Sequence, residues 1–325
     1  HLGSMSKLPL HRERRMHAND SLHRFAVLVA AATLLLIFAG GLVTSTGSGL
    51  SVPDWPLSFG RLFPEMTGGV AYEHGHRMVA ALVGLLTLIL ALWLWKREPR
   101  RWVKMLGAVA VGAVIAQALL GGATVLLRLP LVLSVGHAAL AQVFLCLTIA
   151  IAVATSSAWR EGNATADAGN HSVIVVAVLT MIAVFVQILL GAMVRHTGGG
   201  LAIPDFPLSY GRLVPPYFTT QVLFNYSHRV GAIVVLLLGI WLVVKAVRLP
   251  RSAGIRFPAR LLTGLLVLQI LLGGATVWSR KEPLLTTFHV ACGAIVLAIS
   301  LWLAMSAFRA RGWTPARSQV EVPAA

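Results

Sequence analysis

The 325-residue chain is strongly apolar and strongly basic: 57% of its residues are hydrophobic, 12% are charged, the mean hydropathy is +0.79 and the net charge is +16. So few charges cannot cover a water-soluble surface, which excludes an ordinary soluble protein and predicts an all-α polytopic membrane protein. No basic stretch is long or set among aromatic residues as nucleic-acid binding would require. The positive charge is therefore interpreted as a signal of topology and of contact with anionic lipids.

Eight apolar stretches are each long enough to cross about 30 Å of hydrocarbon as a helix, which takes roughly 20 residues. They lie at 25–44, 73–95, 102–126, 131–155, 172–194, 224–247, 258–278 and 284–308. Proline and glycine gather in the connections near 53–69 and 198–216, whereas the spans carry mostly Leu, Val, Ile and Ala. Each span can therefore satisfy its own backbone hydrogen bonds in lipid.

The eight spans group into two sets of four. We expect a tail, a four-helix bundle, a linker, a second four-helix bundle and a second tail, at 1–24, 25–155, 156–171, 172–308 and 309–325. The four residues before Met5 are typical of a cloning remnant. With the N-terminus in the cytoplasm, 19 of the 27 Lys and Arg residues lie on the cytoplasmic side. This asymmetry predicts cytoplasmic termini and a cytoplasmic linker. The expected location is a cytoplasmic (inner) membrane of the bacterial type.

Four histidines form two pairs with the same internal spacing. His76 and His137 are 61 residues apart, as are His228 and His289, and a shift of 152 residues carries the first pair onto the second. A shift of 151 residues superimposes the proline-rich loops that precede them. The chain is therefore predicted to be a tandem duplication, with two bundles of the same orientation and one related site in each.

Both histidines of a pair lie in the first two turns of spans that start at the outer face, so their imidazoles can meet at one level. A flat cofactor between the rings is the natural occupant. Haem iron takes one axial ligand on each side of the macrocycle, and imidazole is a common one. Ionisable residues inside a membrane are functional candidates because burying them is costly. The pattern predicts a bis-histidine haem on His76 and His137 and another on His228 and His289.

Other metal assignments are weaker. Structural zinc takes four ligands close together, usually with cysteine, and no second pair of donors adjoins either histidine pair. His74 points about 200° away from His76 around the helix and corresponds to Tyr226, so it is not expected to be a ligand. The remaining histidines are expected at the surface, in tails or loops; they are His11, His17, His23, His171 and His196.

Repeated polar residues near the histidines are candidates for contact with the cofactor. Arg77 and Arg229 each follow a histidine directly, and a guanidinium pairs well with a carboxylate. A haem propionate is the expected partner, with a lipid headgroup or a loop aspartate such as Asp54 or Asp205 as the alternative.

Small residues repeat at 121–124 and 273–276, where they either line a cofactor or let helices approach closely. The candidate lining residues are Gln117, Thr124, Gln269 and Thr276.

Glu73 distinguishes the halves. It precedes His76 by about one helical turn on nearly the same face, and the residue at the same place before His228 is Asn225. Only the first half therefore has a carboxylate beside its predicted iron, which favours a catalytic first site and an electron-transfer second site. Glu73 is the candidate proton acceptor. An acid that merely occupies a helix N-terminus is the alternative.

The chain resembles the haem A synthase family, the membrane enzymes of cytochrome oxidase assembly. The resemblance is carried by the eight spans, the four histidines, Glu73 and Asn225 at matched places, and the outer loop that begins at Thr46. It extends from about 25 to 308. It implies that haem O is the substrate and that its C8 methyl group is oxidised, through a hydroxymethyl intermediate, to the formyl group of haem A.

The resemblance also implies a role for each half. His228 and His289 would bind a resident haem b, and His76 and His137 would bind the substrate haem. Glu73 would be essential. Some bacterial members carry a cysteine pair in the first outer loop, which is absent from 50–56 here, so the chain resembles the cysteine-free type.

The only cysteines, Cys146 and Cys292, lie in different spans at non-equivalent depths, and no disulfide is expected between them. Oxygen chemistry stays open at this stage. A bis-histidine iron has no free position, so either a histidine leaves or oxygen enters as water at an oxidised carbon.

A dihaem cytochrome b that passes electrons from quinol is the alternative function, and a duplicated transporter is a minor one. Besides haem O and membrane lipid, expected partners are an unidentified electron donor or acceptor, haem O synthase and oxidase assembly factors. A homo-oligomer is a further open prediction.

Overall fold

The computed structural model describes residues 7–161, 171–248 and 253–310. Across these residues the chain is helical, and strand pairing is limited to isolated bridges in the two long loops. The long helices are α1 (Lys7–Ser45), α2 (Gly68–Arg97), α3 (Arg101–Leu126), α4 (Leu131–Thr155), α6 (His171–His196), α7 (Thr220–Val247), α8 (Ala253–Trp278) and α9 (Pro283–Ala310). The short elements are α5 (Ser157–Glu161) and the 3-10 helix η2 (Gly199–Leu201).

Eight helices are long and apolar enough to cross a membrane, which confirms the predicted class and the number of spans. Several boundaries differ from the prediction. The N-terminal segment is helical from Lys7, α2 begins at Gly68, α7 begins at Thr220, and the expected linker contains α5. Hydropathy locates only the part of a helix that lies in lipid, whereas polar residues can continue the same hydrogen-bonded helix beyond it. Residues 1–4 and 311–325 lie outside the described part of the chain.

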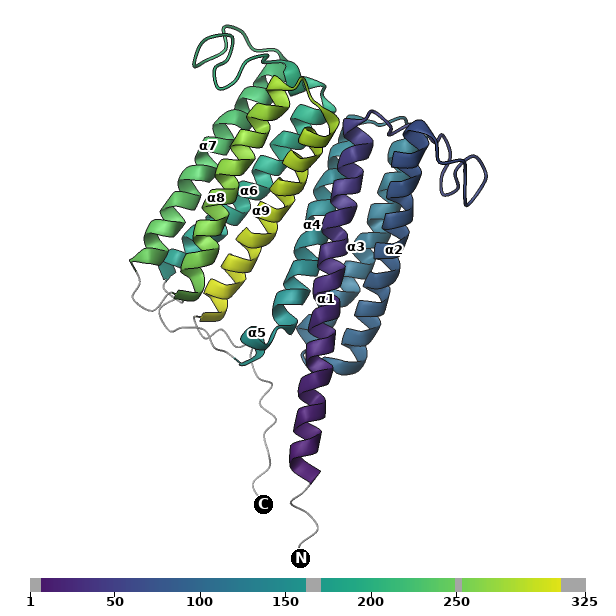
Figure 1. The fold of residues 1–325 in the computed structure, drawn as a ribbon, viewed down its shortest axis with the longest axis vertical. Coiled ribbons are helices and arrows are strands. Elements are labelled where there is room, and N and C mark those ends of the chain that lie inside the picture. Colours follow the sequence, from purple (N-terminus) through teal and green to yellow (C-terminus); the bar gives the residue numbers. More distant parts are fainter. Residues whose placement is uncertain (1–6, 162–170, 249–252, 311–325) are drawn as a thin grey trace, which may run out of the picture.

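The helices form two groups of four that stand side by side, α1–α4 and α6–α9 (Figure 1). In the first group, α1 and α3 each pack against both α2 and α4. In the second, α6 and α8 each pack against both α7 and α9. Both long loops lie at one end of the molecule, and α1 begins and α9 ends toward the other. We call the end with the long loops the outer end.

Each group has its own apolar core. The first includes Val83 and Phe144, and the second includes Leu242 and Leu297. A small third cluster centred on Leu145 joins the groups, where α1 and α4 meet α9. The span in α9 is 56% buried and that in α4 is 44% buried, against 17% for α3 and α8. The inner helices α4 and α9 therefore join the halves, and α3 and α8 face the lipid.

Candidate functional site

The four histidines lie at matched depths on helices that start at the outer end. His76 and His228 come eight residues after the first residues of α2 and α7. His137 and His289 come six residues after the first residues of α4 and α9. At 1.5 Å per residue, these positions lie roughly 12 and 9 Å below the helix starts. His76 and His228 are therefore in the third turn, deeper than predicted, because both helices begin earlier than their apolar stretches.

The second pair has a ring separation compatible with two axial ligands of one ion. The ring centres of His228 and His289 are 6.3 Å apart and the ring planes are inclined by 82°. Two imidazoles that bind one ion from opposite sides, through bonds of about 2 Å each, have ring centres roughly 6 to 6.5 Å apart. The residues present therefore fit an iron ion between them.

The first pair has buried ring nitrogens, as does His289 of the second pair. His76 and His137 are close enough for their charges to interact. The Nδ1 atoms of His76, His137 and His289 are buried and have no hydrogen-bond partner within the described residues. A buried polar atom without a partner is costly unless a ligand or water satisfies the residue. Within the described part of the chain, no three His, Cys, Asp or Glu side chains gather as a structural zinc site would require.

Each of the four rings rests on a glycine of the neighbouring helix. A Cβ atom at these glycines would lie 2.9–3.2 Å from Cε1 of the histidine ring, closer than carbon atoms normally approach. The pairs are Gly40 with His76, Gly121 with His137, Gly191 with His228 and Gly273 with His289. Gly40 and Gly191 correspond at a shift of 151 residues, a signal that the sequence-based interpretation does not use.

Three of the histidines also receive a hydrogen bond from a glutamine that stands four residues before the supporting glycine. In each case the amide nitrogen donates to the histidine carbonyl oxygen. The bonds are Gln117 to His137 (2.9 Å), Gln187 to His228 (2.7 Å) and Gln269 to His289 (2.8 Å). The predicted lining residues Gln117 and Gln269 are therefore brought to the histidines, and Gln187 is an addition. At the fourth place, before Gly40, stands Leu36.

Arg77 and Arg229 hold the outer loops onto the histidine-bearing helices. Nη1 of Arg77 donates to the carbonyl oxygens of Asp54 (2.8 Å) and Leu57 (2.9 Å). Nη1 of Arg229 donates to the carbonyl oxygens of Asp205 (2.7 Å) and Leu208 (2.8 Å). Both arginines therefore bind the outer loops, as in the alternative to a propionate partner. They bind backbone carbonyl oxygens, and not the carboxylates of Asp54 and Asp205. Contact with a propionate stays a prediction for both arginines.

Asp54 and Asp205 each accept hydrogen bonds from backbone N–H groups of their own loop. The backbone N–H groups of Gly60 and Phe59 donate to the Asp54 carboxylate and hold its pKa below the usual value. Gly211 and Tyr210 do the same for the pKa of Asp205. Charge-assisted bonds of this kind favour the ionised carboxylate, so both loops are most ordered when these aspartates are charged.

Glu73 and Asn225 occupy the same place but bond differently. Glu73 is buried; its Oε1 accepts from Nη2 of Arg77 (2.7 Å) and its Oε2 accepts from the Val52 N–H (2.9 Å). Asn225 is also buried; its Oδ1 accepts from Arg229, and its Nδ2 donates to the Gly199 carbonyl oxygen (2.8 Å). Both residues thus tie a loop to a helix, and only Glu73 brings a negative charge.

The other repeated positions are explained by packing. Gly122 accommodates the Trp55 ring, and Gly274 accommodates the Phe206 ring, because a Cβ atom would lie 2.5 Å and 2.8 Å from those rings. The second glycine of each Gly-Gly pair therefore receives a loop aromatic. The hydroxyls of Thr124 and Thr276 donate to carbonyl oxygens of their own helices, at Gly121 and Leu272. A cofactor-lining role for these threonines stays a prediction.

The remaining histidines of the described residues divide into four cases. His11 and His17 lie on the helix α1. Nδ1 of His74 shares a hydrogen bond with the Ser58 hydroxyl (2.8 Å) in the outer loop. His23 and His196 are not loop residues: His23 lies on α1 with Nδ1 3.0 Å from the Ala152 carbonyl oxygen, and His196 ends α6. His171 is exposed but begins α6.

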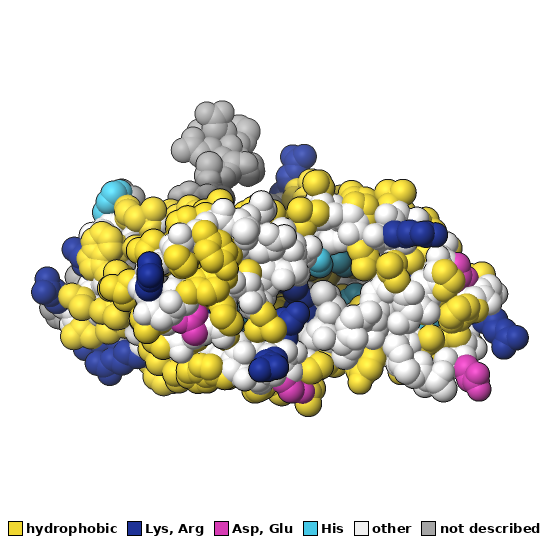
Figure 2. Space-filling model, turned by 90° about the horizontal axis from the view of Figure 1, so that it is seen from above, with side chains coloured by type: hydrophobic (Ala, Val, Ile, Leu, Met, Phe, Trp, Pro, Cys, Tyr) yellow, Lys and Arg dark blue, Asp and Glu magenta, His cyan; other side chains and the backbone are white. Residues whose placement is uncertain are grey.

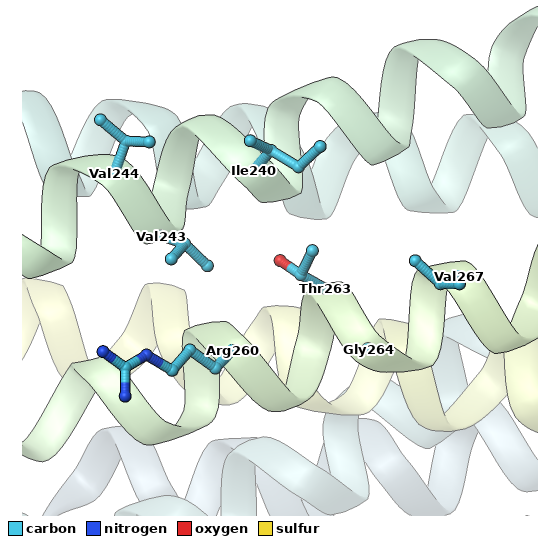
Figure 3. A pocket seen from close by; sticks show the side chains of 7 residues that line it. All are labelled: Ile240, Val243, Val244, Arg260, Thr263, Gly264 and Val267. Atoms are coloured by element: carbon cyan, nitrogen blue, oxygen red, sulfur yellow. The ribbon is translucent and has the colours of Figure 1, made fainter.

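A shallow pocket between α7 and α8 is separate from these sites (Figure 3). It lies toward the inner end, past the histidine level on both helices, and is mostly apolar. Its lining residues are Ile240, Val243, Val244, Arg260, Thr263, Gly264 and Val267. A groove of this kind on a lipid-facing surface is suited to acyl chains and brings none of the four histidines into reach.

A family model described as a cytochrome oxidase assembly protein, COX15-CtaA, matches residues 23–69 and 66–301. The chain belongs to this family. It is 30% identical over 296 residues to a protein named Heme A synthase from Shouchella clausii, covering 88% of this chain and 97% of that protein. It is 31% identical over 291 residues to the Heme A synthase of Bacillus licheniformis, covering 84% and 93%. To that of Symbiobacterium thermophilum it is 34% identical over 223 residues, covering 65% and 71%.

Membership of the COX15-CtaA family confirms the resemblance stated from the sequence. Cys146 and Cys292 are both free cysteines in the structure.

Proposed function

We propose that the protein is a haem A synthase, which oxidises the C8 methyl group of haem O to the formyl group of haem A through a hydroxymethyl intermediate. The product would serve cytochrome oxidase assembly. One observation carries the proposal: a chain that aligns with heme A synthases over most of its length also has two half-buried histidine pairs at matched positions on its helices.

We assign the resident haem b to His228 and His289 and the substrate haem to His76 and His137. The assignment is supported by the glutamine bonds at both histidines of the second pair and by the carboxylate that only the first half carries. Haem b, when bound, supplies one-electron transfer. His228 and His289 would hold and orient it, with Gln187 and Gln269 fixing their helices.

Glu73 is proposed as the proton acceptor. Conversion of a methyl to a formyl group with one oxygen from water removes four electrons and four protons, so the site needs a base and an exit for protons. Glu73 is one turn from His76, and its carboxylate already bonds Arg77 and the loop. Arg77 would hold the charged form in place, and the loop would keep bulk water from the substrate edge.

The electrons require an acceptor outside the chain, which we place among the membrane partners, and haem O synthase and oxidase assembly factors are proposed as neighbours in haem transfer. We also propose cytoplasmic termini, because the basic residues gather at the inner ends of the helices. Reporter fusions at Glu161 and near Gly69 should then report opposite sides of the membrane. Fusions that report the same side would contradict this topology.

The function is tested by identifying the pigments. The purified protein should release haem B on extraction, and cells that supply haem O should accumulate haem A when the wild-type protein is present. Chromatography of the extracted haems measures both. Low-spin haem without conversion of haem O would instead support a dihaem cytochrome b, and a protein without haem absorbance would support a transporter.

A further inference from the structure

Arg195 is a cationic side chain in the seam between the two halves. It lies at the outer end of α6, one turn beyond Gly191, the glycine that supports the His228 ring. Its Nη2 donates to the Gly41 carbonyl oxygen (2.7 Å) and lies 2.7 Å from the Ser45 hydroxyl, both on α1 of the other half. None of the salt bridges within the described residues includes it.

The bonding of Arg195 is incomplete compared with that of the other two arginines near the sites. Arg77 and Arg229 each bond three loop carbonyl oxygens and one side chain. Within the described residues, the hydrogen bonds of Arg195 come from a single amino group. A largely buried cation is costly unless an anion compensates it, and the planar fork of a guanidinium matches a carboxylate.

The position of Arg195 on α6 favours the second histidine pair as the source of that anion. Arg195 stands one turn beyond Gly191, whose backbone lies against the His228 ring. Seen from the outer end, the molecule is hollowed between the halves, and histidine and basic side chains are visible in the hollow (Figure 2). At a shift of 151 residues the first half has Thr44, so this cation is not repeated.

We propose that Arg195 is a carboxylate-binding site that takes a propionate group of the haem held between His228 and His289. The inference rests on the proposed haem b site. The propionates are the polar edge of the macrocycle and are expected to point toward the outer, polar end, where Arg195 lies. Because the same side chain bonds α1, it also connects this haem to the helix that supports His76.

Redox titration of the full chain in detergent, followed by the absorbance of the low-spin ferrous haem, tests the charge. Arg195→Gln should lower the reduction potential of this haem, because a nearby positive charge stabilises the reduced form. Arg195→Lys keeps the charge and should stay close to wild type. Ser45→Ala removes a contact of Arg195 with α1 but leaves the charge, and should leave the potential unchanged.

Reconstitution with haem b and with its dimethyl ester identifies the anion. The wild-type apoprotein should bind haem b about 10 to 100 times more tightly than the ester, the value of one charge-assisted hydrogen bond. Arg195→Gln should lose this discrimination. If the partner were a lipid phosphate or a free anion, wild type and Arg195→Gln would discriminate equally, and the inference would be wrong.

Two further outcomes are decisive. A wild-type potential in Arg195→Gln, or an equal shift in Ser45→Ala, would overturn the inference while leaving the proposed function intact. A wild-type protein that binds no low-spin haem would overturn the proposed function and the inference together.

Discussion

In both halves, a glycine of the neighbouring helix lies against each histidine ring. The two halves differ in the hydrogen bonds that hold the histidines in place. In the second half both histidines are tied to a neighbouring helix by a glutamine, Gln187 or Gln269. In the first half only His137 is tied, and Leu36 stands where His76 would need a glutamine. Two of the differences between the halves, the missing glutamine and the added carboxylate of Glu73, lie beside His76. The two halves thus differ in the residues around one histidine, His76.

This difference bears on the question of an open iron position. Hydrogen bonds to the ring of a metal-binding histidine orient it and typically change metal affinity 10- to 100-fold. Gln187 makes such a contact as well as its backbone bond, with its amide nitrogen 3.0 Å from Nδ1 of His228. Beside His76, Leu36 takes the place from which a glutamine bonds each of the other three histidines. If a histidine dissociates from the substrate iron during turnover, we therefore expect it to be His76 and not His137.

The largest expected effect comes from removing the ligands of one half at a time. His228→Ala or His289→Ala should abolish the low-spin haem b absorbance of the purified protein, because one imidazole cannot keep the iron six-coordinate. His76→Ala should retain that absorbance and lose haem A production. Optical spectra and haem extraction measure both. Intact haem b spectra in His228→Ala and His289→Ala would break the assignment of the halves.

Glu73→Gln should come next in size. The amide keeps the shape and can still accept from Val52 but is no longer a base, so haem A formation should fall by about 10²- to 10⁴-fold while haem b is retained. Extraction should then show haem O or the hydroxymethyl intermediate.

Asn225→Ala is the matched control, because it cuts the corresponding loop tie to Gly199 without touching a carboxylate. If Asn225→Ala lowers turnover as far as Glu73→Gln, the role of both residues is to anchor a loop. Wild-type turnover in Glu73→Gln would leave the proton acceptor unidentified.

The glutamine pattern predicts a smaller, reciprocal effect. Gln187→Leu gives the second half the arrangement of the first and should speed loss of haem b to an excess of a haem-scavenging protein by roughly 10- to 100-fold. Leu36→Gln gives the first half the arrangement of the second, and should slow substrate turnover while strengthening the low-spin spectrum of the first site. Equal haem release from wild type and Gln187→Leu would remove this distinction between the halves.

Substituting the glycines that lie against the histidine rings should lower stability to a similar extent in both halves. Gly40→Ala and Gly191→Ala place a Cβ atom 3.0 Å and 2.9 Å from a histidine ring, and should cost about 1–3 kcal/mol through overpacking. Gly264→Ala is the control, since nothing lies within 4 Å of a Cβ there. Thermal unfolding in detergent measures the difference. A control that loses as much as Gly191→Ala would contradict the close-contact explanation.

Acid sensitivity of the outer loops should be the smallest effect and should not distinguish the halves. Asp54 and Asp205 have a lowered pKa in the folded protein, so their contribution is present above the unfolded value of about 3.9 and is lost as the pH falls through the lower folded value. Hydrogen exchange at Gly60 and Gly211 should therefore accelerate only at strongly acidic pH. The Asn variants should exchange faster already at neutral pH.

The sequence predicts the spans and the four histidines because both depend on one-dimensional signals, hydropathy and equal spacing. The residues that support the histidines are harder to predict. Gly40 and Gly191 are two of many small residues in membrane helices. Only the packing of α1 on α2 and of α6 on α7 shows that they lie against the rings of His76 and His228. Arg77 is assigned to a propionate from its chemistry, whereas its contacts depend on how the loop folds back.

The small cluster around Leu145 that joins the two groups of helices has a practical consequence for protein engineering. Each half carries a complete apolar core and its own histidine pair, and the described segments on either side of the connection end at Glu161 and resume at His171. A gene divided there would encode two four-helix polypeptides that associate in the membrane through α1, α4, α6 and α9. Such a split protein would allow each haem site to be isotope-labelled or redesigned on a separate chain.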